Sequence, residues 1–147
     1  MGEREDHLTL LLRLLSARNA VVRRFDADLA VLGLGLTDFV ILLRLGESPR
    51  IRRVELAEQV GLTPSGVTRA LVPLERLGLV TRERDERDAR LGPAVLTPRG
   101  EQLLAEARKR ARHLADEVVG DDWDEGELTA FAAALQRTRS AAERRSG

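Results

Sequence analysis

Apolar residues recur every three or four positions along most of the chain, which is the spacing of helices that bury one face. In the first half, between glycine-containing breaks, this pattern covers about 5–31, 38–46, 53–60 and 64–77. It returns over about 98–119 and again around Leu128, Phe131 and Leu135. The chain is therefore predicted to be mainly helical, with a core built from leucine, valine and alanine.

Residues 79–96 depart from the helical spacing. They consist of "LVTRER", a charged tip "DERDAR" and a second arm "LGPAVL". Two extended arms around a short turn predict a small β-hairpin. Pro93 lies in the second arm and cannot donate to a strand ladder, so this arm is predicted to be an edge strand. The predicted order is α-α-α-α-β-β-α-α.

Four helix starts carry capping signals. One of them is Thr97 before Pro98, which repeats the signal of Thr63 before Pro64 and opens the segment at about 98–119. Thr37 is predicted to cap the helix that begins at about 38, and Thr63 the helix that begins at Pro64. Asp124 and Glu127 have the spacing of a capping box before the last helix. These signals divide the helical segments more sharply than the apolar pattern does.

Composition narrows the chemistry. The chain has 147 residues, no cysteine and two histidines, His7 and His113, which are far apart in sequence. Disulfides and thiolate metal sites are therefore excluded, and no metal site or cofactor is expected. No nucleophile–base constellation and no phosphate-cradling glycine loop is present, so an enzyme has little support. The paired acids at 121–122 are explained by the adjacent helix start.

The charges balance overall. Basic and acidic residues number 24 each, and Lys109 is the only lysine among the basic ones. A nucleic-acid-binding chain of zero net charge must segregate its charges, and arginine is the better bidentate group for bases and phosphates. Coding bias in a GC-rich genome is the other explanation for the excess of arginine over lysine. The longest apolar run is short and interrupted by Arg13, so a soluble, cytoplasmic protein with no membrane partner is expected.

The segments 53–60 and 64–77 are separated by three residues that include Gly61, the spacing of a helix-turn-helix. On a helical wheel the second segment has one apolar side, formed by Val67, Ala70, Leu71 and Leu74. Ser65 and Arg69 point the other way, with Thr68 at the edge. Short polar side chains and an arginine suit the major groove of DNA, and a solvated face is the alternative.

The predicted hairpin follows this helix directly. Its tip carries Arg84, Arg87 and Arg90, with Asp85 and Asp88 spaced to orient the guanidinium groups. Arginine is attracted to a narrow minor groove by its negative potential. A helix-turn-helix followed by an arginine-tipped hairpin predicts a winged helix-turn-helix.

The central segment also resembles the MarR family of dimeric winged-helix transcription regulators. The matching motifs are "ELA" at 55–57, "VTR" at 67–69, "LE" at 74–75, "GLV" at 78–80, "DAR" at 88–90 and "LTP" at 96–98 followed by Gly100. The likeness is dense over about 54–100 and looser outside it, although "LTDFVILLRL" resembles the family's second helix. Pro73 and Pro93 depart from the family pattern, and Pro73 is predicted to kink its helix.

The resemblance implies roles for individual residues. It assigns the major groove to Ser65, Gly66, Thr68 and Arg69. It places Arg90 in the minor groove, where Asp88 orients it. Arg82 and Arg87 become candidates for phosphate contacts.

The resemblance also implies a homodimer and three regions: an N-terminal dimerisation helix (1–32), a winged helix-turn-helix domain (33–97) and C-terminal dimerisation helices (98–147). The apolar stripes of the outer helices agree with a symmetric interface, although they could instead pack within one chain. Such regulators often bind a small aromatic or anionic effector between these regions. His7, Arg13, Phe25 and Phe39 are candidates for that site, with core or surface duty as the alternative.

The sequence therefore predicts a homodimeric, sequence-specific DNA-binding transcription regulator, most simply a repressor of a pseudo-palindromic operator. The alternative is a winged-helix protein–protein interaction module that does not bind DNA.

Overall fold

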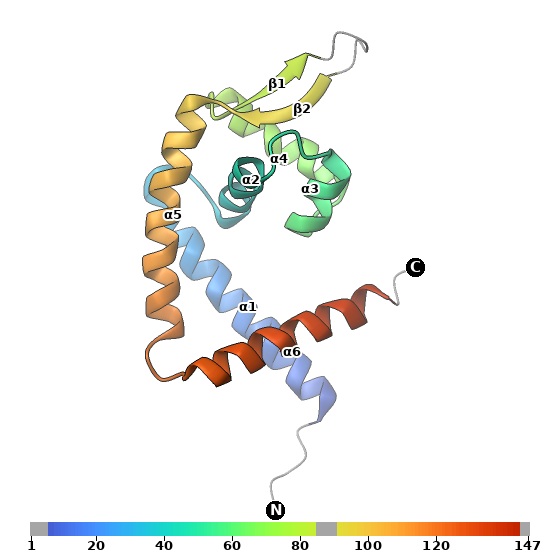
Figure 1. Cartoon of the computed structure of the whole chain (residues 1–147), viewed down its shortest axis with the longest axis vertical. Helices are drawn as coiled ribbons and strands as arrows, with labels where there is room; N and C mark the ends of the chain where they lie inside the picture. Colours follow the sequence, from blue (N-terminus) through green and yellow to red (C-terminus); the bar gives the residue numbers. More distant parts are fainter. Residues whose placement is uncertain (1–5, 85–90, 145–147) are drawn as a thin grey trace, which may run out of the picture. The chain divides into compact units, whose positions relative to one another are not determined.

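The computed structural model describes residues 6–84 and 91–144 of the chain. The elements are α1 (His7–Leu29), η1 (Ala30–Leu32), α2 (Leu36–Glu47), α3 (Arg53–Val60), α4 (Pro64–Arg76), β1 (Val80–Arg84), β2 (Leu91–Leu96), α5 (Pro98–Val119) and α6 (Glu125–Glu143). Figure 1 labels all of them except the short η1. Met1–Leu114 and Ala115–Gly147 form two compact units, and each is considered by itself. The predicted mainly helical class with one hairpin is confirmed.

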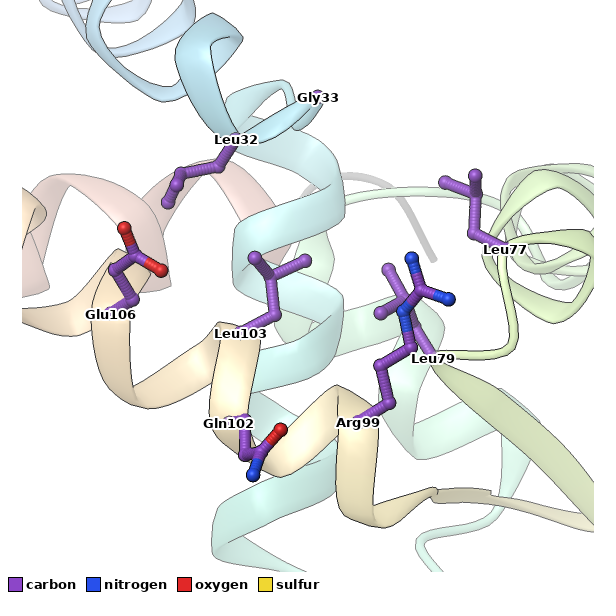
Figure 2. A pocket seen from close by; sticks show the side chains of 8 residues that line it. All are labelled: Leu32, Gly33, Leu77, Leu79, Arg99, Gln102, Leu103 and Glu106. Carbon is purple, nitrogen blue, oxygen red and sulfur yellow. The ribbon is translucent and has the colours of Figure 1, made fainter.

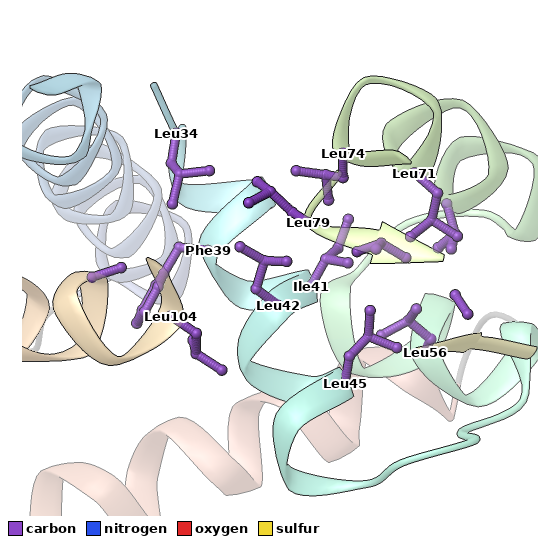
Figure 3. Packing of buried hydrophobic residues seen from close by; sticks show 14 of the residues in the cluster. Leu34, Phe39, Ile41, Leu42, Leu45, Leu56, Leu71, Leu74, Leu79 and Leu104 are labelled. Carbon is purple, nitrogen blue, oxygen red and sulfur yellow. The ribbon is translucent and has the colours of Figure 1, made fainter. Parts of the chain in front are cut away.

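The core of the first unit is a leucine cluster around α2. Ile41, Leu42 and Leu45 of α2 are buried, and they pack with Leu56 of α3 and Leu71 of α4 (Figure 3). Fully burying one such side chain contributes about 1.5–3 kcal/mol. Because α2, α3 and α4 share this cluster, the hydrophobic effect fixes the two helices of the helix-turn-helix against a common support.

The turn between α3 and α4 is short and held by glycine. α3 ends at Gly61, whose φ of 76° lies in the left-handed region that favours glycine. The amides of Gly61 and Leu62 both donate to the Ala57 carbonyl, each at 2.9 Å. α4 then begins at Pro64, as predicted from its cap and its proline.

The hairpin contains an irregularity at its proline. Arg82 pairs with Ala94 in antiparallel register, but the next pair along is Arg84 with Leu91, so the register shifts between them. Glu83 therefore faces two residues of β2, 92 and 93. A bulge leaves a residue without a ladder partner, and proline is tolerated there because it has no N–H to donate.

The exit from the hairpin is locked to the end of α4. The Thr97 hydroxyl donates to the Gly78 carbonyl at 2.6 Å and accepts from the Gly100 amide at 3.0 Å, which caps α5. The Thr97 amide donates to the Leu79 carbonyl at 3.0 Å. A Cβ on Gly100 would lie 2.0 Å from that carbonyl oxygen, so glycine is required here by a close backbone approach.

The predicted cap of α2 is wrong. α2 begins at Leu36 with Gly35 as its N-cap, and Thr37 lies exposed within the first turn. The Asp38 carboxylate accepts from the Gly35 amide at 2.8 Å, and the Leu36 amide donates to Asp26 of α1 at 2.7 Å. A carboxylate from the preceding helix thus satisfies a helix start that lies two residues earlier than the local signal predicts.

In the second unit, the predicted capping box at the start of α6 is confirmed. The Asp124 amide donates to Glu127 at 3.0 Å, and the Glu127 amide donates to Asp124 at 2.8 Å. The rings of Trp123 and Phe131 lie 5.4 Å apart between centroids. Both side chains are exposed in the single chain.

Across residues 6–84 and 91–144, we find no single helix that is both long enough and apolar enough to span a membrane. α1 with η1 and α2 reach that length and composition only together, across a bend of 75°.

The two threonines give a direct test of helix capping. We expect Thr63→Ala to lower the free energy of unfolding by about 1 kcal/mol, because the Thr63 hydroxyl accepts from the Gly66 amide. Thr37→Ala is the matched control, with an expected change within about 0.5 kcal/mol. Urea denaturation at one fixed protein concentration measures both, and equal losses would contradict the assignment of Gly35 as the α2 cap.

Candidate nucleic-acid interface

α4 presents one apolar and one polar face, as its sequence predicts. Val67, Leu71 and Leu74 are buried in the core. On the opposite side Ser65 and Arg69 are exposed. The burial of one side fixes the rotation of the helix, so the polar side necessarily points out of the core.

The amino-terminal turn of α4 gathers hydroxyl groups and a glycine. The Thr63 hydroxyl accepts from the Gly66 amide at 3.0 Å and lies 3.1 Å from the Ser65 hydroxyl. A Cβ on Gly66 would lie 3.1 Å from the Thr63 hydroxyl and 3.5 Å from the Leu62 Cβ, so a larger residue would crowd the cap. The positive end of a helix with short side chains around it is suited to an approaching anion.

Thr68 links α4 to an arginine of α3 that the sequence reasoning missed. Its hydroxyl donates to the Pro64 carbonyl at 3.1 Å and accepts from Arg53 Nη1, also at 3.1 Å. An open hollow at this place is lined by Arg53, Pro64, Ser65, Thr68 and Arg69. The signal for Arg53 was available, since "RIRR" at 50–53 places three arginines directly before and at the start of α3.

The arginines around this face differ in their partners. Arg52 donates to Glu55, and this hydrogen bond lowers the pKa of the Glu55 carboxyl. Arg50 pairs with Glu83 at 2.9 Å. Within residues 6–84 and 91–144, no carboxylate lies within ion-pair distance of Arg53 or Arg69. Among the described residues, the charges of Arg53 and Arg69 are therefore not paired with an acid.

Arg82 lies on β1 and faces α4. Its Nε is 2.8 Å from Glu75 Oε1, and the two side chains are 17% and 33% exposed. With Arg50, Arg52 and Arg53, Arg82 surrounds a second hollow between α3, α4 and the hairpin, whose floor is apolar. Arg82, a candidate for a phosphate contact, is thus paired with an acid of α4.

The remaining predicted DNA-contact residues fall outside the described part of the chain. These are Arg87, Asp88 and Arg90. Arg84, at the end of β1, is described and exposed. Of the predicted set, Ser65, Gly66, Thr68 and Arg69 come together on one side of α4, next to Arg53.

The four effector candidates do not converge on one place. Phe39 is buried in the core and Phe25 packs against it, whereas His7 and Arg13 are on the amino-terminal half of α1. Eighteen residues separate His7 from Phe25 on one helix, which corresponds to about 27 Å. Over the described residues, we find no group of three or more histidine, aspartate or glutamate side chains placed to hold a metal ion.

A different hollow lies between η1, the end of α4 and the start of α5 (Figure 2). Its walls include Leu32, Leu77, Leu79 and Leu103. Arg99 and Glu106 stand at opposite ends of this lining (Figure 2). Its volume is about 370 Å³, and none of the four effector candidates lines it.

Comparison with known proteins gives a consistent result. The family model described as "MarR family" matches residues 34–91. The HTH-type transcriptional repressor Rv2887 of Mycobacterium tuberculosis is 38% identical over 100 residues, which cover 67% of this chain and 72% of that protein.

Two solved structures extend the likeness to almost the whole chain. The crystal structure of Rv2887 in complex with salicylic acid has a TM-score of 0.69 and 28% identity, covering 94% of this chain and 99% of that one. The transcriptional repressor CouR, bound to a 23-mer DNA duplex, has a TM-score of 0.79 and 25% identity, covering 95% and 99%.

Proposed function

Because the chain belongs to the MarR family, we propose that it is a homodimeric transcriptional regulator that binds a pseudo-palindromic operator with α4 in the major groove. Repression by occluding a promoter is the simplest mode, in keeping with the repressor named among its relatives. The observation that carries the proposal is the cluster of Ser65, Thr68 and Arg69 with Arg53 on one exposed side of the helix-turn-helix.

The chemistry of this cluster suits a DNA groove. Ser65 and Thr68 have short side chains that let the helix approach base edges closely, and Gly66 removes a side chain from the same turn. Arg69 can pair in bidentate fashion with O6 and N7 of a guanine. Arg53, at the first turn of α3, is suited to a phosphate beside the groove.

The wing, which is the hairpin of β1 and β2 with the residues that join them, completes the contact with DNA in this proposal. Arg90 enters the adjacent minor groove and Asp88 orients it, while Arg87 contacts a phosphate. The family resemblance of "DAR" at 88–90 supports these roles. Arginine is the side chain that a narrow minor groove attracts most strongly.

Exposed apolar side chains support the homodimer. α1 exposes Leu8, Leu11, Leu12 and Leu15, and the second unit exposes Trp123, Leu128, Phe131 and Leu135. Apolar stripes of this kind mark interaction surfaces. A two-fold dimer would present two α4 helices to half-sites about one helical turn apart, roughly 34–36 Å.

Arg69 provides the test of DNA reading. We expect Arg69→Ala to weaken binding by about 1–3 kcal/mol to a duplex that the protein enriches from a random-sequence pool. The affinity for a duplex of random sequence should change much less. Fluorescence anisotropy at several salt concentrations measures both. Arg76 is another exposed arginine of the same helix, and Arg76→Ala should weaken binding to both duplexes equally. If the wild-type protein binds no DNA, the protein–protein interaction module becomes the better reading.

Phe131 provides the test of assembly. We expect Phe131→Asp to yield monomers at micromolar concentration and to weaken duplex binding by about 100-fold, because each half-site is then bound independently. Gln136→Asp introduces the same charge on another side of α6 and should leave the dimer intact. Analytical ultracentrifugation measures the mass, and an unchanged dimer for Phe131→Asp would contradict the role of this stripe.

We further propose that a small aromatic carboxylate acts as effector in the hollow of Figure 2. Its leucines suit an aromatic ring and Arg99 suits a carboxylate. The salicylic acid complex of Rv2887 supports this class of ligand. Occupation of a hollow between η1, α4 and α5 would change the equilibrium position of the recognition helix and thereby the affinity for DNA.

Salicylate is the probe for this site. We expect millimolar salicylate to raise the dissociation constant of the protein–duplex complex by about 5- to 150-fold, the range of ordinary allosteric coupling. Arg99→Gln should remove the response, and Arg112→Gln, an exposed arginine further along α5, should retain it. Equal responses of the two variants in an anisotropy titration would exclude Arg99 from the site.

A further inference from the structure

The base of the wing is tied to the recognition helix by one partly buried ion pair. Arg82 of β1 donates from Nε to Glu75 Oε1 of α4 at 2.8 Å, with side chains 17% and 33% exposed. Arg82 lines the same hollow as Val67 and Leu71 of α4. A charge that is largely withdrawn from water requires its partner, so separating this pair is unfavourable.

The Glu75–Arg82 pair lies at the point of the hairpin where the regular strand pairing ends. Arg82 is the last residue of β1 in regular register, opposite the buried Ala94. Immediately beyond it, Glu83 faces residues 92 and 93 at the bulge. Bulges bend a strand and increase its twist. The bulge that sets the direction of the rest of the hairpin therefore lies directly next to Arg82, which the pair with Glu75 holds in place.

A second ion pair lies beside the first but is weaker. Arg50, which has a positive φ of 66°, pairs through Nε with Glu83 at 2.9 Å. These side chains are 71% and 38% exposed, so solvent screens their attraction. Successive side chains of a strand point to opposite faces, and Arg82 and Glu83 are consecutive. The two ion pairs therefore hold β1 from opposite faces. Glu75–Arg82 is the better shielded of the two.

We propose that Glu75 is a positioning residue for DNA binding, which acts through Arg82 to fix the angle between the wing and α4. The proposal rests on the DNA-binding function argued above. Glu75 is an anion, so its direct electrostatic effect on a DNA duplex is repulsive. If Glu75 positions the wing, neutralising it lowers the affinity for DNA. If Glu75 acts only through its charge, neutralising it raises that affinity.

Neutralising Glu75 separates the two effects. With the full chain and a duplex enriched from a random-sequence pool, we expect Glu75→Gln to weaken binding by about tenfold, because the wing loses its anchor. Glu58→Gln, at an exposed position of α3, removes the same charge without touching the wing. That control should bind as tightly as the wild type or slightly more tightly. Fluorescence anisotropy measures the dissociation constants.

Two further measurements distinguish positioning from general stability. Hydroxyl-radical footprinting of the Glu75→Gln complex should keep the protection centred on each half-site and lose the flanking protection. The reversed pair, Glu75→Arg with Arg82→Glu, should bind more tightly than Glu75→Gln although its net charge is less positive, because it restores the attraction between the strand and the helix.

The outcomes separate the two proposals. Failure of the wild-type protein to enrich or bind any duplex would overturn the DNA-binding function itself. Wild-type binding with equal affinities for Glu75→Gln and Glu58→Gln would overturn only the role of Glu75. A uniformly weakened footprint together with a lowered melting temperature would assign Glu75 to stability and would also overturn positioning.

Discussion

The Leu79 carbonyl is the point on which the arrangement of the DNA-binding unit depends. It accepts from the Thr97 amide and lies against the backbone of Gly100, so the end of α4, the start of β1 and the start of α5 meet within one set of backbone contacts. Any side chain at position 100 would push these three elements apart. A displacement of α5 is therefore passed directly to the helix that we assign to the major groove, without a flexible linker to absorb it.

The surface around α4 shows how a chain with zero net charge can still offer a cationic face. The acids are used locally: Glu55 neutralises Arg52, Glu83 pairs with Arg50 and Glu75 holds Arg82. Arg53 instead bonds to the hydroxyl of Thr68, and no carboxylate in the described part of the chain pairs with it. Paired arginines build the scaffold, whereas Arg53 and Arg69, which pair with no carboxylate among the described residues, remain available at its surface.

Local sequence signals predicted the parts of the fold that local physics determines. The periodicity of α4, the cap at Thr63 and the box at Asp124 depend on residues within four positions of each other, and all three are confirmed. The α2 cap was mispredicted because Asp26, ten residues before Leu36, supplies the acceptor.

The candidate site was predicted in part for the same reason. Helical periodicity was enough to bring Ser65, Thr68 and Arg69 to one side of α4. The bond from Arg53 to Thr68 spans 15 residues, and the pair between Glu75 and Arg82 joins a helix to a strand. Neither follows from spacing, because both require the packing of α3 and β1 against α4 to be known. The roles assigned to the wing tip stay predictions.

The contact between Trp123 and Phe131 has a spectroscopic consequence. The chain contains a single tryptophan, and it lies beside the exposed apolar stripe of α6. Its indole emission therefore reports on the solvent around that one location, and it shifts to shorter wavelength when another surface covers the stripe. Association of two chains could thus be followed without any attached label, with no second indole to complicate the signal.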